Sequence, residues 1–447
     1  MRIQKYDGSR FKQTNIDPTK IYRTSSWQNL YAIDSEDYMS SSGGFVNFYS
    51  RIIYPHAIYN SGQDKTVMVY QNTSLHPYAI EYNHSTKLWS SAYQIGTNPL
   101  SATNDDHGGP AIFHDFDGYY HVFYGCHASH TTGCKHAKSD SPNDISSWTA
   151  QSELTGSLTY PKIFEVADGT IFLFFREDFE RSIYYKSTDN CATWSSSTTY
   201  CEFNYTGGHQ EYGNIVYDSV NERFHKVFGC RYPNGSPNLD WAHNRNAYYM
   251  YMDIDNENWY NSDDALITDV DCETDTLIWD SGDLTNHYIT FDMHCSSGKI
   301  YAFAPSLDTD GCSSAAEVLQ NPGEPRFLYY DGSDWTVSTP FPTHKNPDLL
   351  LNCRVIAEDH LQVFLSYLRS GSSQSFTFGG NVEEWEYYNG IWTFIRTVLD
   401  SSDNGKYNGR PTIVHGANEE LVWFFDEGSD SAGTATKIWA YGDRGII

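Results

Sequence analysis

The sequence predicts an all-β protein, a seven-bladed β-propeller built from four-stranded antiparallel blades. Three observations lead to this fold class. Helical periodicity is nearly absent from the 447 residues. Short apolar or alternating runs are separated by dense turn signals such as "FDGYY", "ADGTI" and "YDGSDW". The pattern recurs about every 45–75 residues, which is typical of radial repetition. Two packed β-sandwiches are the alternative fold.

The predicted blades share one internal order. A first strand leads through a turn into a strongly apolar second strand, such as "HVFYGCH", "IFLFFRE" or "HKVFGCR", and a third strand and a Trp-bearing fourth follow. We assign residues 1–447 to a single propeller domain. The blades are expected at about residues 51–98, 105–154, 157–203, 209–262, 285–341, 346–399 and 408–447.

The last predicted blade lacks an obvious fourth strand. The N-terminal segment, residues 1–50, contains "WQNLYAID" at residues 27–34, which has the pattern of a strand. We expect this segment to supply the missing strand, so that the N- and C-terminal strands pair and close the ring. Closure of this kind removes free sheet edges, which are sites of aggregation.

The chain is strongly acidic, with 57 Asp and Glu residues against 29 Lys and Arg and a formal net charge of −28. A surface of this charge repels nucleic acid and anionic membranes, so neither is an expected partner. It also suits a saline habitat, where salt screens self-repulsion. The sequence contains no apolar run of about 18 residues, so we expect no membrane insertion.

The N-terminal stretch "MRIQKYDGSRFKQTN" lacks the apolar segment of a secretory signal peptide. We expect an extracellular or surface-exposed protein, either secreted with a signal that is absent from this chain or carried on a virion. A cytoplasmic protein is the alternative. The sequence does not specify an oligomeric state.

The nine cysteines contain no CxxC pair. Cys191 and Cys201 flank one hairpin and could be bridged. A zinc site is conceivable at Cys126, His130, Cys134 and His136, although their spacing matches no standard finger. The acidic loops at residues 261–271 and 308–312 are candidates for Ca²⁺. Any such Zn²⁺ or Ca²⁺ would be structural, since the predicted chemistry requires no cofactor.

Propeller geometry selects candidate ligand-binding residues without any motif. The start of a blade's first strand and the end of its antiparallel second strand lie on the same face of the ring. The starts of first strands carry His56, His107, Tyr160, Tyr212, His287, Arg354 and Arg410, and the ends of second strands carry His127, Arg176 and Arg231. In the second to fourth blades these residues form an arc of histidine, tyrosine and arginine side chains.

Such an arc suits proton abstraction beside a carboxylate. Arginine pairs bidentately with a carboxylate, and His or Tyr can remove or donate a proton. No nucleophile elbow or Ser-His-Asp arrangement is readable. The combination is that of β-elimination from a uronic acid, in which neutralising the carboxylate stabilises an enolate-like intermediate. The expected partner is therefore an anionic polysaccharide or a cell-surface glycan.

The stretches "DDHGGPAIFHDFDGYYHVFYGCHASH" and "TYPKIFEVADGTIFLFFRE" resemble the seven-bladed propeller polysaccharide lyases of the ulvan lyase type, within the BNR (Asp-box) repeat group. The resemblance covers roughly residues 100–235 best. It implies catalytic roles for His107, His127, Tyr160 and Arg176, with Tyr212 as a looser match. Arg176 would neutralise the uronate, and Tyr160 or His107 would act as base, with the other or His127 as acid.

One departure is that the Asp-box pattern S-x-D-x-G-x-T-W occurs once, from Ser187 to Trp194, with Cys191 in place of glycine. Two other functions stay open. A non-catalytic glycan- or receptor-binding propeller would keep the pocket without turnover. A sialidase-like hydrolase would need three converging arginines, which Arg176, Arg231, Arg354 and Arg410 could supply.

Overall fold

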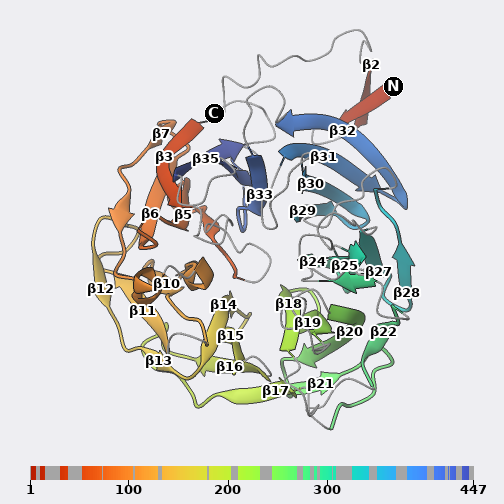
Figure 1. Ribbon diagram of the computed structural model, residues 1–447, viewed down its shortest axis with the longest axis horizontal. Helices are drawn as coiled ribbons and strands as arrows, with labels where there is room; N and C mark the ends of the chain where they lie inside the picture. Colours follow the sequence, from red (N-terminus) through yellow and green to blue (C-terminus); the bar gives the residue numbers. More distant parts are fainter. Residues whose placement is uncertain are drawn as a thin grey trace.

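The computed structural model describes most of the chain. The described residues are 2–6, 11–15, 31–38, 53–72, 74–103, 106–128, 133–178, 181–202, 210–231, 244–268, 275–281, 286–288, 292–304, 306–308, 325–341, 350–368, 380–399, 407–417, 421, 423–428 and 435–441. They form an all-β propeller, as predicted, in which antiparallel sheets stand around a central channel (Figure 1). Helix among them is confined to two short 3₁₀ turns, η2 (Pro99–Ala102) and η3 (Asp106–Gly108). None of these residues forms a helix with the length and apolar character needed to span a bilayer.

The first two sheets have five strands each. The first contains β4 (Ala57–Asn60), β5 (Lys65–Gln71), β6 (Pro77–Asn83), β7 (Leu88–Trp89) and β8 (Tyr93–Gln94). The second contains β9 (Ala111–His114), β10 (Tyr120–Tyr124), β11 (Gly133–Ser139), β12 (Trp148–Ala150) and β13 (Leu154–Thr155). In both, the first four strands pair in chain order, and the fifth joins the third strand.

The next three sheets follow the same plan. The third contains β14 (Leu158–Glu165), β15 (Ile171–Glu177), β16 (Arg181–Ser187) and β17 (Thr198–Glu202). The fourth contains β18 (Gln210–Asp218), β19 (Arg223–Arg231), β20 (Asn244–Asp253), β21 (Asn258–Tyr260) and β22 (Leu277–Trp279). The fifth contains β24 (Asp292–Ser296), β25 (Lys299–Ala304), β27 (Arg326–Tyr330) and β28 (Trp335–Ser338).

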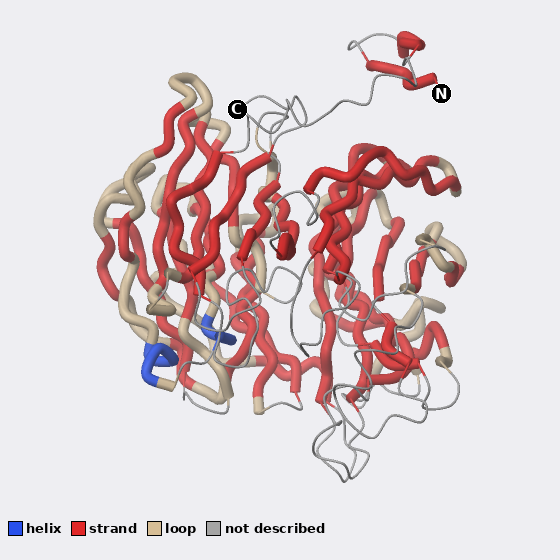
Figure 2. Tube along the Cα trace, turned by 45° about the horizontal axis from the view of Figure 1, so that its top comes forward, coloured by secondary structure: helices blue, strands red, loops and turns tan. Residues whose placement is uncertain are grey.

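Two short ribbons lie outside this plan. One pairs β1 (Arg2–Tyr6) with β2 (Phe11–Asn15), and the other pairs β23 (Asn286–Tyr288) with β26 (Ser306–Asp308). Figure 2 shows the β1–β2 ribbon standing apart from the ring of sheets.

The sixth sheet has eight strands and corrects the predicted blade count. It contains β29 (Leu350–Ala357), β30 (His360–Leu368), β31 (Gly380–Tyr388), β32 (Ile391–Leu399), β33 (Tyr407–Ile413), β34 (Trp423–Gly428), β35 (Ala435–Tyr441) and β3 (Tyr31–Tyr38). Seven separate blades were expected, whereas the described residues form six sheets of four or more strands. The last two predicted units are joined because Gly380 of β31 pairs with Asn408 of β33.

The N-terminal segment contributes a strand beside the C-terminal one. β3 pairs antiparallel with β35, with Ile33 opposite Ile438. The strand begins four residues later than the segment expected from the sequence, at Tyr31 instead of Trp27. Closure of the whole ring by this pairing stays a prediction.

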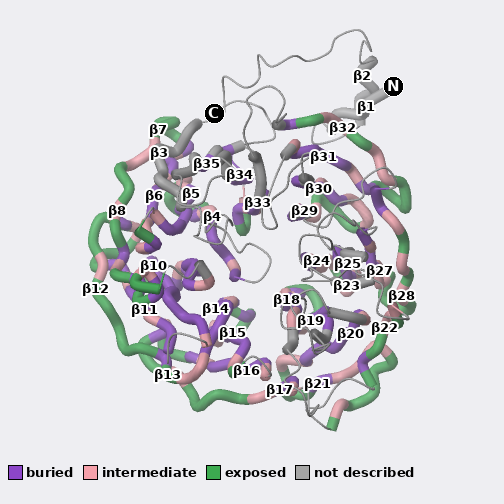
Figure 3. Tube along the Cα trace, viewed as in Figure 1, coloured by how far each residue is buried: buried purple, intermediate pink, exposed green. Residues whose placement is uncertain are grey.

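Apolar clusters fill the spaces between neighbouring sheets. Phe172 and Phe174 of β15 pack against Phe224 of β19, and Val67 of β5 belongs to one cluster with Val122 of β10. Another cluster combines residues of β5 and β6 with residues of β34 and β35. Buried residues therefore concentrate on the inner strands, and exposed residues on the outermost strands (Figure 3). Burying each of these Phe or Val side chains contributes about 1.5–3 kcal/mol.

The Asp-box at Ser187–Trp194 forms a turn after β16. Asp189 accepts hydrogen bonds from the Thr193 backbone N–H at 2.8 Å and the Thr193 hydroxyl at 2.5 Å, and Ser187 Oγ accepts from the Cys191 N–H at 3.0 Å. Cys191 has a φ of 61°, a conformation that favours the glycine of the consensus. No disulfide joins Cys191 to Cys201, which belong to different apolar clusters.

A buried Asp-His-His network crosses the second sheet. His121 Nε2 lies 3.0 Å from Asp115 Oδ2, and His121 Nδ1 lies 2.9 Å from His136 Nε2. Burial lowers the pKa of His136 from 6.5 to about 3. Burial also lowers the pKa of His121, against the opposing effect of the Asp115 carboxylate. The two imidazoles therefore stay neutral in the folded protein at pH values where exposed histidines are charged.

This network predicts a loss of stability in mild acid. The folded pKa of His136 lies below its unfolded value, so protonation favours the unfolded state, and no penalty arises while the histidine is neutral in both states. The free energy of unfolding is therefore highest above pH 6.5 and falls as the pH drops from 6.5 towards 3. Between pH 6.5 and 5 we expect the titration of His136 to lower the free energy of unfolding by about 1.5 kcal/mol. Urea unfolding of the native protein and of His136→Gln should show a shallower pH dependence in the variant. Equal slopes would contradict the assignment.

Candidate active site

Tyr160 is held at the face of the propeller by a break in its strand. The pairing of β14 with β15 shifts register between Thr159 and Lys162, and Tyr160 within this bulge has a φ of 63°. A positive φ at a bulky residue costs on the order of 1–3 kcal/mol and is maintained only when surrounding structure enforces it. Bulges redirect side chains at sheet rims. The bulge therefore aims the Tyr160 side chain out of the regular alternation of β14.

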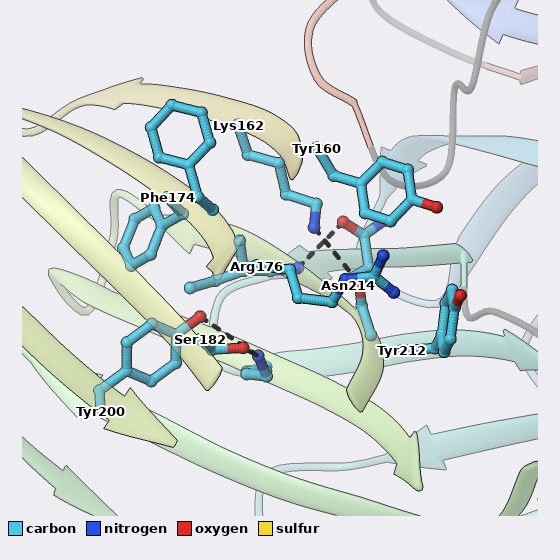
Figure 4. A pocket seen from close by; sticks show the side chains of 12 residues that line it. Tyr160, Lys162, Phe174, Arg176, Ser182, Tyr200, Tyr212 and Asn214 are labelled. Atoms are coloured by element: carbon cyan, nitrogen blue, oxygen red, sulfur yellow. Dashed lines mark hydrogen bonds between the residues drawn. The ribbon is translucent and has the colours of Figure 1, made fainter. Parts of the chain in front are cut away.

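Arg176 lies next to Tyr160, near the end of β15. Its backbone pairs with Thr159 of β14, so the fold brings residues 160 and 176 together on one rim. The guanidinium carbon is 4.7 Å from the ring centroids of both Tyr160 and Tyr212. Figure 4 shows the guanidinium between the two tyrosines. Aromatic faces attract and orient a cation at this distance, so the two rings fix the position of the Arg176 charge.

His107 lies in a turn and not at the start of a strand, which corrects the local prediction. It belongs to η3, and β9 begins only at Ala111, after Gly108-Gly109-Pro110. The Gly125 N–H donates to the Gly108 carbonyl at 3.0 Å and ties this turn to the end of β10. A Cβ on Gly108 would lie 2.7 Å from Leu100 Cδ1 and 2.9 Å from Asn98 Nδ2. The glycine is therefore needed for close approach of the turn to η2.

The two histidines stack on each other beside Tyr160. The His107 and His127 ring centroids are 3.8 Å apart at an interplanar angle of 9°, and the His107 ring is 5.9 Å from the Tyr160 ring. Two positive charges at this separation repel, so the geometry disfavours double protonation of the pair. His127, Tyr160 and Arg176 are all less than 10% exposed.

Five sequence-predicted residues thus form one continuous row. Neighbouring side chains are in contact in the order His127, His107, Tyr160, Arg176 and Tyr212. We call this set the rim row. His107 and His127 lie in the loops next to strands of the second sheet, since β10 ends at Tyr124, before the strand end predicted at His127. The third and fourth sheets supply the other three residues.

The other predicted residues lie apart or outside the described side chains. His56 is buried below Gly109, where a Cβ would lie 4.0 Å from His56 Cε1. Arg354 lines the cavity in the central channel instead of the pocket around Arg176. The side chains of Arg231, His287 and Arg410 are outside the described part of the structure, so their roles stay predictions.

Sequence reasoning missed two lysines, Lys162 and Lys226, that line the same small pocket as Arg176. Lys226 is 3% exposed, and its Nζ donates to Ser182 Oγ at 2.7 Å and Tyr200 OH at 3.2 Å. Lys162 Nζ donates to the Gly213 carbonyl at 3.3 Å (Figure 4). Three cations near one pocket create a local positive potential in an acidic protein. The sequence signal was a lysine inside the apolar run "HKVFGCR".

The predicted metal ligands in the second sheet are only partly described. Cys126, Cys134 and His136 are buried, and His136 Nε2 already contacts His121. His130 lies outside the described residues. Zinc at this position and calcium in the acidic loops therefore stay predictions.

The chain is similar in sequence to one protein family and to several known proteins. The model of the family described as BNR repeat-containing matches residues 57–340. An ulvan lyase of Alteromonas sp. (strain LOR) is 36% identical over 166 residues, which cover 33% of this chain and 34% of that protein. An ulvan lyase of Nonlabens ulvanivorans is 28% identical over 453 residues, which cover 92% of this chain and 90% of that protein. The chain thus spans about a third of the first relative's length and nine tenths of the second's.

A solved structure supports the fold. The structure described as a new family of polysaccharide lyase, PL25 ulvan lyase, matches with a TM-score of 0.76 and 18% identity and covers 93% of this chain and 96% of that chain. A second structure of the same description is bound to -[GlcA(1-4)Rha3S]-.

The packing of Gly108 predicts the effect of filling its space. Gly108→Ala should destabilise the protein by about 1–3 kcal/mol, because Leu100 and Asn98 are buried and cannot move aside freely. Gly62→Ala is the control, since a Cβ at this position would lie 3.5 Å from the nearest atom, Asn60 Oδ1. Thermal unfolding measures both variants, and equal stability of the two would contradict the packing argument.

Proposed function

The chain belongs to the BNR repeat-containing family, and we propose that it is a polysaccharide lyase that cleaves a uronate-containing anionic polysaccharide of the ulvan type by β-elimination. The observation that carries this proposal is the rim row, which places an oriented arginine next to potential proton-transfer groups. The lyases named among the relatives support the same chemistry.

Arg176 neutralises the uronate carboxylate in this mechanism. The proton on C5 of a uronic acid is weakly acidic, and removing it moves negative charge onto the carboxylate. A guanidinium held between Tyr160 and Tyr212 pairs with that carboxylate without first having to reorganise. Lys162 and Lys226, which line the same pocket, add positive potential.

Tyr160, His107 and His127 divide the proton transfers. One group takes the C5 proton, the C4–O bond breaks as the C4–C5 double bond forms, and a second group protonates the leaving oxygen. Tyr160 or His107 is the base, with the other or His127 as the acid. The stacked histidines suit this exchange, because their contact favours one proton on the pair instead of two.

We further propose that residues 1–447 form one propeller whose ring is closed by the β3–β35 pairing. Closure would keep the second to fourth sheets at fixed angles to one another, and the side chains of the rim row would therefore stay in contact. The protein acts outside the cell or on a surface, where its polymeric substrate is found, and it makes no use of nucleic acid or membrane. The chemistry requires no metal cofactor.

Lyase activity is testable by the ultraviolet absorbance of the unsaturated uronate product. We expect absorbance to rise with ulvan and to be lost in Tyr160→Phe. In Arg176→Lys, turnover should fall at least about 100-fold, because an ammonium group cannot replace the two parallel N–H donors of the planar guanidinium.

Two conservative controls belong with this assay. Arg181→Lys and Tyr78→Phe change side chains outside the rim row. Arg181 donates to Asp178 and Tyr78 donates to Gln94. Both variants should retain activity within about twofold. Near-normal turnover in Arg176→Lys would refute the proposal that Arg176 pairs with the uronate carboxylate. Binding without absorbance across a panel of uronate polymers would instead identify a non-catalytic glycan-binding propeller.

The net charge predicts how activity responds to salt. A chain with a formal charge of −28 repels an anionic polymer at long range. Raising the ionic strength from about 0.01 to 0.15 M shortens the Debye length from about 30 to about 8 Å. We expect KM for the polymer to fall severalfold over this range while kcat changes little. An increase of KM with salt would show that local attraction outweighs the net repulsion.

A further inference from the structure

A second group of reactive side chains lies inside the central channel, away from the rim row. The channel contains a cavity of about 840 Å³. Its walls include Ile163–Glu165 of β14 and Val216–Tyr217 of β18, which are later residues of the strands that begin at the rim. Asp292, His294 and Cys353 line the same cavity.

The topology brings these three residues together from two sheets. Asp292 and His294 are two residues apart on β24, so their side chains point to the same face of that strand. Cys353 comes from β29 of the neighbouring sheet. One ligand atom from each residue lies within 4.8 Å of the other two, and His294 Nε2 is 3.2 Å from Asp292 Oδ2.

The donor set identifies the kind of cation that fits. A thiolate, an imidazole and a carboxylate are the three ligand types of protein zinc sites. Calcium and magnesium prefer oxygen ligands alone, so this set disfavours them. Asp292 and Cys353 are buried, at 2% and 0% exposure. A divalent cation would compensate the cost of a carboxylate kept out of bulk water.

We propose that Asp292, His294 and Cys353 bind one Zn²⁺ ion in the central channel. The thiol releases its proton on binding, and water from the cavity occupies the fourth position of a tetrahedral ion. The ion connects β24 to β29 and so ties the fifth sheet to the sixth. This role is structural and is independent of the proposed lyase activity.

Metal analysis of the full-length protein tests this assignment. The protein is stripped with a chelator, dialysed against low-micromolar Zn²⁺ and analysed for bound zinc, and a second sample is loaded with Co²⁺. We expect one equivalent of zinc per chain and a higher melting temperature than that of the stripped protein. The Co²⁺ sample should show a thiolate charge-transfer band and the intense visible bands of tetrahedral cobalt.

Single substitutions locate the ion. Cys353→Ser should abolish the charge-transfer band, and Asp292→Asn and His294→Gln should lower zinc content to near zero at the same free concentration. Cys191→Ser, a buried thiol of the third sheet, and His114→Gln, a histidine on the same cavity wall, are matched controls that should keep one equivalent. Zinc content unchanged in all three ligand variants, or no zinc retained by the native chain, would overturn the proposal. If Cys353→Ser fails to fold, the other two variants and the cobalt spectrum decide the question.

Discussion

The position of the Arg176 guanidinium between the Tyr160 and Tyr212 rings is the interaction on which the candidate active site depends. Tyr160 reaches that position only because a bulge in β14 holds its backbone at a positive φ. The cost of this conformation is met by the regular pairing on either side of the bulge and by the packing of Ile163 and Phe164 into neighbouring clusters. The strained residue and the functional residue are thus the same one, as is common at active sites.

The propeller architecture explains how distant residues of the sequence meet in one row. Each sheet begins at the central channel, and apolar clusters between sheets set the angle from one to the next. Residues at equivalent rim positions of successive sheets therefore become neighbours, although His107 and Tyr212 are separated by about a hundred residues. The same rule operates inside the channel, where Asp292 and Cys353 approach each other from adjacent sheets.

Much of the fold and the rim row could be predicted from the sequence because the signals are local. Apolar second strands, turn dipeptides and the recurrence of both define the sheets, and the rim residues follow from their places in those strands. The resemblance added the roles of His107, His127, Tyr160 and Arg176. What could not be predicted depends on long-range geometry. Gly380 of β31 pairs with Asn408 of β33, although the sequence assigns these two strands to separate blades, and this contact merges the two expected blades.

The missed residues have a similar explanation. Lys226 lies within an apolar run, where strand alternation cannot distinguish a buried lysine from a solvated one, and only the sheet positions of Ser182 and Tyr200 reveal its partners. Asp292, His294 and Cys353 have no motif spacing, since the third ligand belongs to another sheet. His107 was placed at a strand start because Gly108-Gly109-Pro110 allows either a turn or an extended entry.

The central claim is that the rim row breaks a glycosidic bond by elimination and not by hydrolysis. Mass spectrometry of the oligosaccharides released from ulvan in heavy-oxygen water tests it most directly. Elimination predicts products with an unsaturated terminal uronate, one water lighter than hydrolysis products and free of heavy oxygen. Saturated products that carry heavy oxygen would contradict the account.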